Sequence, residues 1–284
     1  MSNLSEFFIN KARKNLGETE SLKKISILKF KKWIEEHSFI KVNEIDDKFL
    51  LIFLRNHKYK LNKVFESFEK TIILLKSYPN WYKLQENEIL QFIDKFDKLF
   101  GLLKYRDING RKIIVLKLKE MTKLNLTANE SLKIATIGFI SILFEEETQI
   151  AGSLFIIDCA EISFDSTSKF PTDEAFQIFT NMTKFGFHIK QIYVVNVPSD
   201  ISPFYKIAIG LLSINSNLIK NLNDLKMVME TSKLLDNNCK YIKENFVSHK
   251  ELLIKTYKEI KKVEVDFSQV ESFVVENFRY SDFD

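Results

Sequence analysis

The sequence predicts an α/β protein in which a small N-terminal helical domain precedes a mixed, largely parallel sheet flanked by helices. Two runs, Ser153–Asp158 and Lys190–Val197, are apolar on both faces over their central residues, as in buried strands of a parallel sheet. Helical patterns separate these runs, and strands alternating with helices indicate parallel α/β units. Residues 1–95, by contrast, show only helical spacing.

Local signals place the helices of the N-terminal part. Helices are expected at Ser21–Glu36, after the acidic pair Asp46 and Asp47, after a capping Asn62, and at Glu86–Leu99. Acidic side chains stabilise the positive end of a helix, and an asparagine can accept a hydrogen bond from its free N–H groups.

A turn marks the entry to the sheet. Asn109-Gly110 is favoured where two successive residues need positive φ, so a turn is expected before the next strand. The remaining elements are a strand at Ile113–Leu118 and helices at Leu126–Phe144, Pro171–Thr183, Pro198–Leu212 and Asn245–Lys262. The predicted domains are a helical domain at 1–95, a ligand-binding domain at 96–250 and a C-terminal extension at 251–284.

Composition and charge exclude several classes of protein. No apolar run approaches the roughly 20 residues needed to span a bilayer. The charged N-terminus does not resemble a secretory signal, and two cysteines are too few for a disulfide framework, so a cytoplasmic location is expected. The net charge of +4 is too small to predict nucleic-acid binding but suits transient attraction to an anionic membrane. We expect a monomer.

The sequence contains no recognisable catalytic or metal-binding pattern. The seven glycines form no phosphate-binding loop, and the four histidines lack metal-ligand spacing. Glu145–Glu147 is interpreted as a solvated acidic cluster, and Asp158 as a residue that fixes a loop by accepting backbone hydrogen bonds. We therefore expect a protein that is not an enzyme and needs no cofactor.

Phenylalanine is unusually abundant. The chain has 26 Phe against 9 Tyr and 2 Trp. The rings either build a large ordinary core or wall a cavity for an apolar ligand, because small-molecule sites are mostly apolar and aromatic.

Six short segments resemble motifs of a known family. They are Asp47–Arg55 (DKFLLIFLR), Lys58–Leu61 (KYKL), Tyr78–Trp81 (YPNW), Asp107–Lys112 (DINGRK), Glu147–Asp158 (ETQIAGSLFIID) and Asn196–Pro198 (NVP). In order and spacing they are similar to motifs of the CRAL-TRIO family of lipid-binding proteins, which includes tocopherol-, retinaldehyde- and phosphatidylinositol-binding members. The resemblance implies a helical domain followed by a sheet that encloses an apolar cavity beneath a mobile gate helix.

The residues expected to line this cavity come from two arguments. Strand alternation places Ser153, Phe155 and Ile157 on one face, beside Ile192 and Val194 of the neighbouring strand. The resemblance adds Leu132, Ala135, Phe139, Phe164, Phe185 and Phe187. The gate helix, which the resemblance places after Pro198, would contribute a stripe of helical spacing, namely Ile201, Phe204, Tyr205, Ala208 and Leu212.

The sequence departs from the phosphoinositide-binding members at their basic cluster. The matching positions hold His188, Lys190, Asn215 and Ile219, and Lys206 and Lys220 are the cations that could substitute. Contact with a membrane or a headgroup is expected at His188, Lys190, Lys206 and Lys220. We therefore predict a soluble carrier for one retinoid, tocopherol, carotenoid or other terpenoid, with phospholipid transfer or membrane sensing as the alternative.

Overall fold

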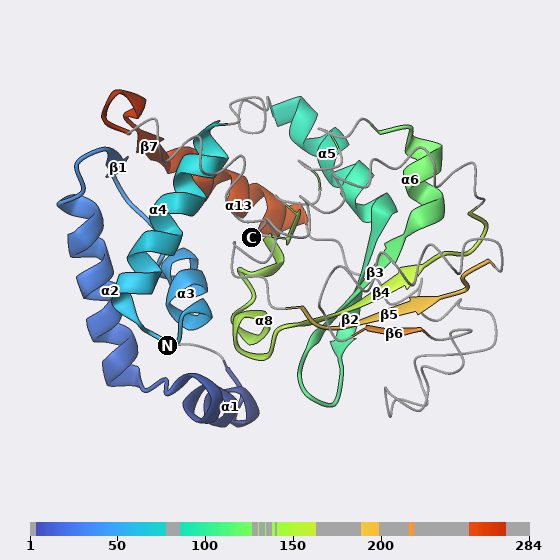
Figure 1. Ribbon diagram of the computed structural model, residues 1–284, viewed down its shortest axis with the longest axis horizontal. Helices are drawn as coiled ribbons and strands as arrows, with labels where there is room; N and C mark the ends of the chain where they lie inside the picture. Colours follow the sequence, from blue (N-terminus) through green and yellow to red (C-terminus); the bar gives the residue numbers. More distant parts are fainter. Residues whose placement is uncertain are drawn as a thin grey trace, which may run out of the picture.

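The computed structural model describes residues 4–77, 86–126, 141–162, 189–198, 216–218 and 250–270, together with 130, 134, 138 and 139. Helices α1 to α4 gather on one side of the molecule and a five-stranded sheet lies on the other (Figure 1). The hydrophobic core is continuous between them, because buried residues of α2, α3, α4, α5 and the sheet belong to one cluster.

The N-terminal helices follow the local signals of the sequence. They are α1 (Glu6–Leu16), α2 (Glu20–Glu35), α3 (Asp47–Asn56), α4 (Leu61–Ser77) and α5 (Glu86–Leu99). The Asp46 carboxylate caps α3 by accepting a hydrogen bond from the Lys48 N–H at 2.7 Å. The predicted cap Asn62 is wrong: α4 begins at Leu61, and the Val64 N–H already donates to the Lys60 carbonyl at 3.0 Å, so Asn62 lies inside the first turn.

Aromatic packing holds these helices together. Every residue of α3 from Phe49 to Arg55 is buried. The Phe68 ring of α4 lies 5.1 Å from both Phe30 of α2 and Phe53 of α3, edge to face in each pair. Much of the phenylalanine content therefore belongs to an ordinary core.

The sheet has the order β2-β3-β4-β5-β6 and is mixed and largely parallel, as predicted. Its strands are β2 (Phe100–Arg106), β3 (Lys112–Lys117), β4 (Ser153–Asp158), β5 (Ile189–Val195) and β6 (Ser216–Leu218). The β2–β3 pair is antiparallel, whereas β3, β4, β5 and β6 run parallel. The short helix α6 (Leu118–Leu124) follows β3, and the short helix α8 (Glu146–Ala151) precedes β4.

The β2–β3 turn differs from the predicted geometry. Only Gly110 has positive φ, at 75°, whereas Asn109 does not. The Asp107 carboxylate accepts hydrogen bonds from the backbone N–H groups of Asn109 and Arg111, at 3.0 and 2.7 Å. The side-chain bonds of Asp107 stabilise a three-residue loop in which glycine alone must adopt the left-handed conformation.

The C-terminal segment packs on the N-terminal helices. Helix α13 (Lys250–Lys262) leads into β7 (Val263–Val265), which pairs antiparallel with β1 (Ile40–Val42), and a single turn η3 (Phe267–Gln269) follows. The Lys255 ammonium lies 2.5 Å from the Asp46 carboxylate. The domain boundaries at 95 and 250 remain predictions. Within the described part of the chain, no helix combines the length and the apolar composition that crossing a membrane requires.

Candidate ligand-binding site

One face of the sheet carries two apolar rows that cross three parallel strands. Ile114 of β3, Phe155 of β4 and Ile192 of β5 lie in register, and their exposed fractions are 0%, 1% and 0%. Leu116, Ile157 and Val194 form the next row in the same register. Because register partners on parallel strands point to the same side, the two rows make a continuous apolar surface.

Phenylalanine rings cover part of this surface. The Phe139 ring lies 5.3 Å from Phe155 and 5.0 Å from Phe100, which lies 4.9 Å from Phe96 of α5. Gly138 permits this packing, because a Cβ on it would lie 1.9 Å from the Phe96 ring. The Phe155 side of the sheet is therefore the side on which the helical segment containing Phe139 packs.

The structure thus brings together six of the predicted cavity residues. They are Phe139, Ser153, Phe155, Ile157, Ile192 and Val194, and all are buried. The other predicted lining residues lie outside the described residues: Leu132, Ala135, Phe164, Phe185, Phe187, Ile201, Phe204, Tyr205, Ala208 and Leu212.

Ser153 is the polar member of this group. It is 1% exposed, and its Oγ has no hydrogen-bond partner among the residues that the structure describes. Its register partner on β3 is Lys112, whose ammonium lies 2.9 Å from the Glu145 carboxylate. Polar groups therefore gather at the amino-terminal ends of β3 and β4, and apolar groups follow along the strands.

Lysines gather near the same end of the sheet. Partial desolvation of the Lys190 ammonium, followed by the positive charges of Lys58 and Lys11, lowers the pKa of Lys190. Sequence reasoning identified Lys190 but missed Lys58 and Lys11, which come from the N-terminal helical part. The positive φ of Lys58, 48°, was not visible in the sequence. His188, Lys206 and Lys220 lie outside the described residues.

Arg55 joins the N-terminal helices to the segment before β4. Its guanidinium donates to both Glu18 carboxylate oxygens at 2.8 Å, to Gln149 Oε1 at 2.7 Å and to Glu146 at 3.1 Å. Burial alone would raise the pKa of Glu18, but the hydrogen bonds and charge of Arg55, with the Tyr59 hydroxyl, outweigh it and lower the pKa. Sequence reasoning missed this buried cluster.

The acidic run Glu145–Glu147 is not a solvated cluster, so that interpretation is wrong. Glu146 is buried against Arg55, while Glu145 lies 2.7 Å from Arg106 and 2.9 Å from Lys112. These carboxylates are already paired with cations and serve to hold α8, which leads into β4.

At the opposite end of β4, Asp158 fixes a loop as predicted. Its Oδ1 accepts hydrogen bonds from the Ala160 N–H at 3.0 Å and from the Asn196 side chain at 2.8 Å. Burial, and then the charge of Asp158, raises the pKa of the neighbouring Cys159 to about 12, so its thiol is not an activated nucleophile. No cluster of metal-ligating side chains occurs within the described ranges.

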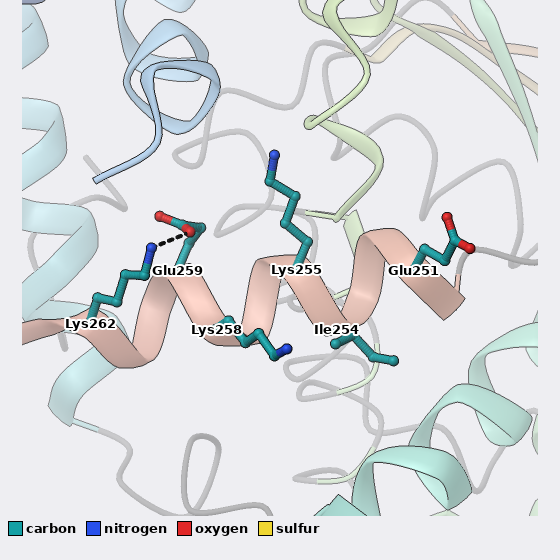
Figure 2. A pocket seen from close by; sticks show the side chains of 6 residues that line it. All are labelled: Glu251, Ile254, Lys255, Lys258, Glu259 and Lys262. Carbon is teal, nitrogen blue, oxygen red and sulfur yellow. Dashed lines mark hydrogen bonds and ion pairs between the residues drawn. The ribbon is translucent and has the colours of Figure 1, made fainter. Parts of the chain in front are cut away.

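A separate groove of about 400 Å³ follows one face of α13 (Figure 2). Its lining comprises Glu251, Ile254, Lys255, Lys258, Glu259 and Lys262. Five of these six lining residues are charged, whereas the two rows across β3, β4 and β5 contain no charged residue. The groove is therefore distinct in chemistry from the apolar face of the sheet.

Comparison with known proteins assigns the family. The model of the CRAL/TRIO domain matches residues 96–237, half of the chain. This chain belongs to the CRAL/TRIO family. The resemblance read from the short motifs is therefore confirmed, and the chain is placed among lipid-binding and lipid-transfer proteins.

Individual CRAL/TRIO relatives are distant. The mouse (Mus musculus) protein named alpha-tocopherol transfer protein-like is 22% identical over 236 residues, covering 77% of this chain and 68% of that protein. Clavesin-1 of Pongo abelii is 29% identical over 171 residues, which is 58% of this chain and only 47% of clavesin-1. The crystal structure of Sfh5 shares the fold, with a TM-score of 0.53 at 9% identity, covering 92% of this chain and 100% of that one.

Proposed function

We propose that this CRAL/TRIO protein carries one lipophilic small molecule, such as a retinoid, a tocopherol, a carotenoid or another terpenoid, in a closed apolar cavity. The observation that carries the proposal is the pair of uncharged rows across β3, β4 and β5. Removing apolar ligand surface from water contributes roughly 25 cal/mol per Å² to the free energy of binding. The two apolar rows can therefore bind an apolar ligand without catalytic or ionic groups. The protein is proposed to act without catalysis, cofactor or metal.

The proposed cycle alternates between a free and a membrane-bound protein. A monomer in the cytoplasm would touch an anionic membrane transiently, load or release its cargo, and leave. The helix expected at residues 199–212 would act as the gate. The mild net charge of +4 supports weak, reversible attraction rather than permanent attachment.

Lipid extraction tests the carrier function directly. The full chain is purified without detergent, its bound lipids are extracted, and their masses and absorption spectra are recorded. The expected result is one dominant terpenoid in an amount equimolar with the protein. Protein that carries no lipid, and takes up none from vesicles containing retinol, tocopherol or phospholipid, would contradict every carrier function.

Phospholipid transfer is the second candidate, and the lysines at the amino-terminal end of the sheet support it. Lys11 and Lys58 each lie close enough to Lys190 to repel its charge, and cations of this kind attract phosphate groups. If this function holds, the extracted lipid is a phospholipid, and the protein moves phosphatidylinositol between vesicles faster than it moves tocopherol. Lys58→Gln and Lys190→Gln should then slow phosphatidylinositol transfer and leave tocopherol transfer unchanged.

A further inference from the structure

Helix α1 leaves an aromatic side chain in water. Ala12 is the buried residue of this helix, whereas Phe7 is 50% exposed and Phe8 is half-buried. Single exposed apolar side chains are common on protein surfaces, but a group of them marks a surface that meets a partner. The neighbours of Phe7 therefore decide whether its exposure has a function.

The β2–β3 turn extends the apolar surface of α1. Gly110 lies directly against both rings, because a Cβ on it would lie 2.8 Å from ring carbons of Phe7 and Phe8. Ile108, two positions earlier in the same turn, is 53% exposed. The Gly110 N–H donates to the Asp107 carbonyl at 2.8 Å, which keeps the turn tight and Ile108 near the rings. Helix α1 and this turn lie at the same edge of the molecule (Figure 1), and Phe7, Phe8 and Ile108 are named the α1–turn patch.

Cations border the α1–turn patch. The Lys11 ammonium lies 5.7 Å from the centre of the Phe7 ring, and the Arg106 guanidinium lies 5.7 Å from the centre of the Phe8 ring. Helix α1 as a whole contains three basic residues and one acidic residue. The exposed rings are thus surrounded mainly by positive charge.

Lys11 connects the patch with the lysines at the amino-terminal end of the sheet. Desolvation, and then the positive charges of Lys58 and Lys11, lowers the pKa of Lys190, so Lys11 lies close to this lysine as well. The acidic residue of the turn, Asp107, is buried and paired with Arg111. It therefore does not offset the positive charge at the surface.

The combination fits an anionic bilayer. A helix with exposed aromatic side chains and several cations lies in the membrane interface, where its apolar side chains reach the acyl boundary and its cations lie among anionic headgroups. A partner helix would instead dock its apolar face in a groove. The α1–turn patch consists of exposed side chains of a helix and a turn, and the groove along α13 includes none of its residues.

We propose that the α1–turn patch is the surface on which the protein meets an anionic membrane. Phe7 and Ile108 insert among the lipids, and Lys11 lies at the headgroups. The inference rests on the transient membrane contact of the proposed function and names the surface that makes it. Bound in this way, the protein holds the turn before β3 at the bilayer.

Partition onto vesicles tests the apolar contribution. The full chain is mixed with vesicles of phosphatidylcholine and phosphatidylserine, and Phe7→Ser should bind them about fivefold more weakly than the wild type, because a half-exposed ring no longer enters the bilayer. Phe267→Ser is the matched control, since this ring of η3 is 44% exposed and follows β7 at the opposite edge of the molecule (Figure 1). It should bind as the wild type does. Both variants should retain the lipid that the wild type carries.

Insertion is measured with a tryptophan at the same position. Tryptophan favours the membrane interface, so Phe7→Trp should keep the affinity of the wild type. Its added fluorescence should be quenched by phosphatidylcholine with brominated acyl chains in vesicles that also contain phosphatidylserine. Phe267→Trp should show no quenching beyond that of the wild type, whose tryptophans, Trp33 and Trp81, provide the baseline.

The charge contribution is tested by Lys11→Gln. This variant should bind the same vesicles about fivefold more weakly at low ionic strength, and salt should remove the difference. Lys70→Gln is the control, because it makes the same charge change at an exposed lysine of α4 that is paired with Glu66 at 2.8 Å. It should leave vesicle binding close to that of the wild type.

The outcomes separate the surface from the membrane contact itself. If the wild type does not bind vesicles with phosphatidylserine, the membrane contact of the proposed function fails and the inference fails with it. If the wild type binds them and Phe7→Ser binds equally well, or if Phe7→Trp is not quenched, the α1–turn patch alone is the wrong surface. A wild type that sediments as a dimer, with Phe7→Ser as a monomer, would assign the patch to a second copy of the chain and overturn the proposal.

Discussion

The Arg55 guanidinium of α3 donates a hydrogen bond to Gln149 Oε1 of α8 at 2.7 Å. Gln149 in turn donates to the carbonyls of Lys48 and Leu143, at 3.1 and 2.6 Å. These bonds tie the N-terminal helices to the segment that leads into β4 and Ser153. The position of the candidate site is therefore set partly by residues outside the sheet.

Replacing Arg55 should lower the free energy of unfolding more than replacing a charged residue on the surface does. Arg55→Met removes the buried ion pairs to Glu18 and Glu146 and leaves Glu146 only Lys48, 3.8 Å away, and breaking a buried pair costs about 3–5 kcal/mol. Urea denaturation measures the change in the free energy of unfolding. Arg13→Met, at an exposed position of α1, is the control and should change it by less than about 0.5 kcal/mol. An equal effect of both variants would show that the cluster does not support the fold.

Lowering the pH should reduce the stability of the folded protein partly through protonation of Glu18. The folded-state pKa of Glu18 is lowered, so its contribution to stability is complete above the unfolded value of about 4.3 and is lost as the pH falls toward the folded value. Urea midpoints from neutral pH down to pH about 3 should decline more steeply for the wild type than for Glu18→Gln. Parallel curves for the two proteins would indicate that Glu18 has the same pKa in both states.

The sequence was sufficient where the determining interaction is local. The cap at Asp46 acts on the next turn of the same helix, and α5 and β4 begin and end where their apolar patterns do. The turn at Asn109-Gly110 was correctly located, but its geometry depends on side-chain hydrogen bonds from Asp107, which the dipeptide does not reveal.

The sequence could not show which residues pair when they lie far apart along the chain. The partners of Arg55 lie 37, 91 and 94 positions away along the chain. For this reason Glu146 was taken for part of a solvated cluster, and the approach of Lys58 to Lys190 was missed. The sequence also could not show that the buried Ser153 hydroxyl lacks a hydrogen-bond partner among the described residues. The alternation along β4 predicts only the face of the sheet on which Ser153 lies.

Gly138 should tolerate no side chain. A Cβ at this position would lie 1.9 Å from a ring carbon of Phe96, so Gly138→Ala must displace the ring that packs on Phe100. The expected loss is about 1–3 kcal/mol or more, as in other overpacked cores. Gly138→Ala combined with Phe96→Leu should lose less than the sum of the two single changes. Additive losses would show that the alanine is accommodated without touching Phe96.

Membrane binding should be weak and sensitive to salt. Lys190→Gln should weaken binding to phosphatidylserine vesicles by about fivefold at low ionic strength, since each basic residue near an anionic surface contributes about 1 kcal/mol. Lys98→Gln makes the same charge change at a lysine paired with Asp94 at 2.6 Å, and it should have little effect. A large, selective increase with one phosphoinositide would instead support a headgroup-reading site around Lys190.

The two sides of β4 should respond differently to truncation. Phe155 is 1% exposed and faces the proposed cargo, whereas Ile156 is 0% exposed and faces the opposite side of the sheet. Both are packed, so Phe155→Ala and Ile156→Ala should each cost several kcal/mol, about 3–5 and 2–5 respectively. The cost to stability alone therefore does not separate a ligand contact from a core residue.

Ligand-induced stabilisation does separate them. A ligand that binds only the folded state raises the thermal midpoint by an amount that depends on its affinity, so each variant is melted with and without pyrenyl-dodecanol. The shift should shrink for Phe155→Ala, because the cargo loses contact area there, and it should persist for Ile156→Ala. Equal loss in both variants would mean that truncation loosens the whole sheet. A full shift in Phe155→Ala would place the cargo away from the apolar rows, since the largest side chain of those rows would then make no contact with it.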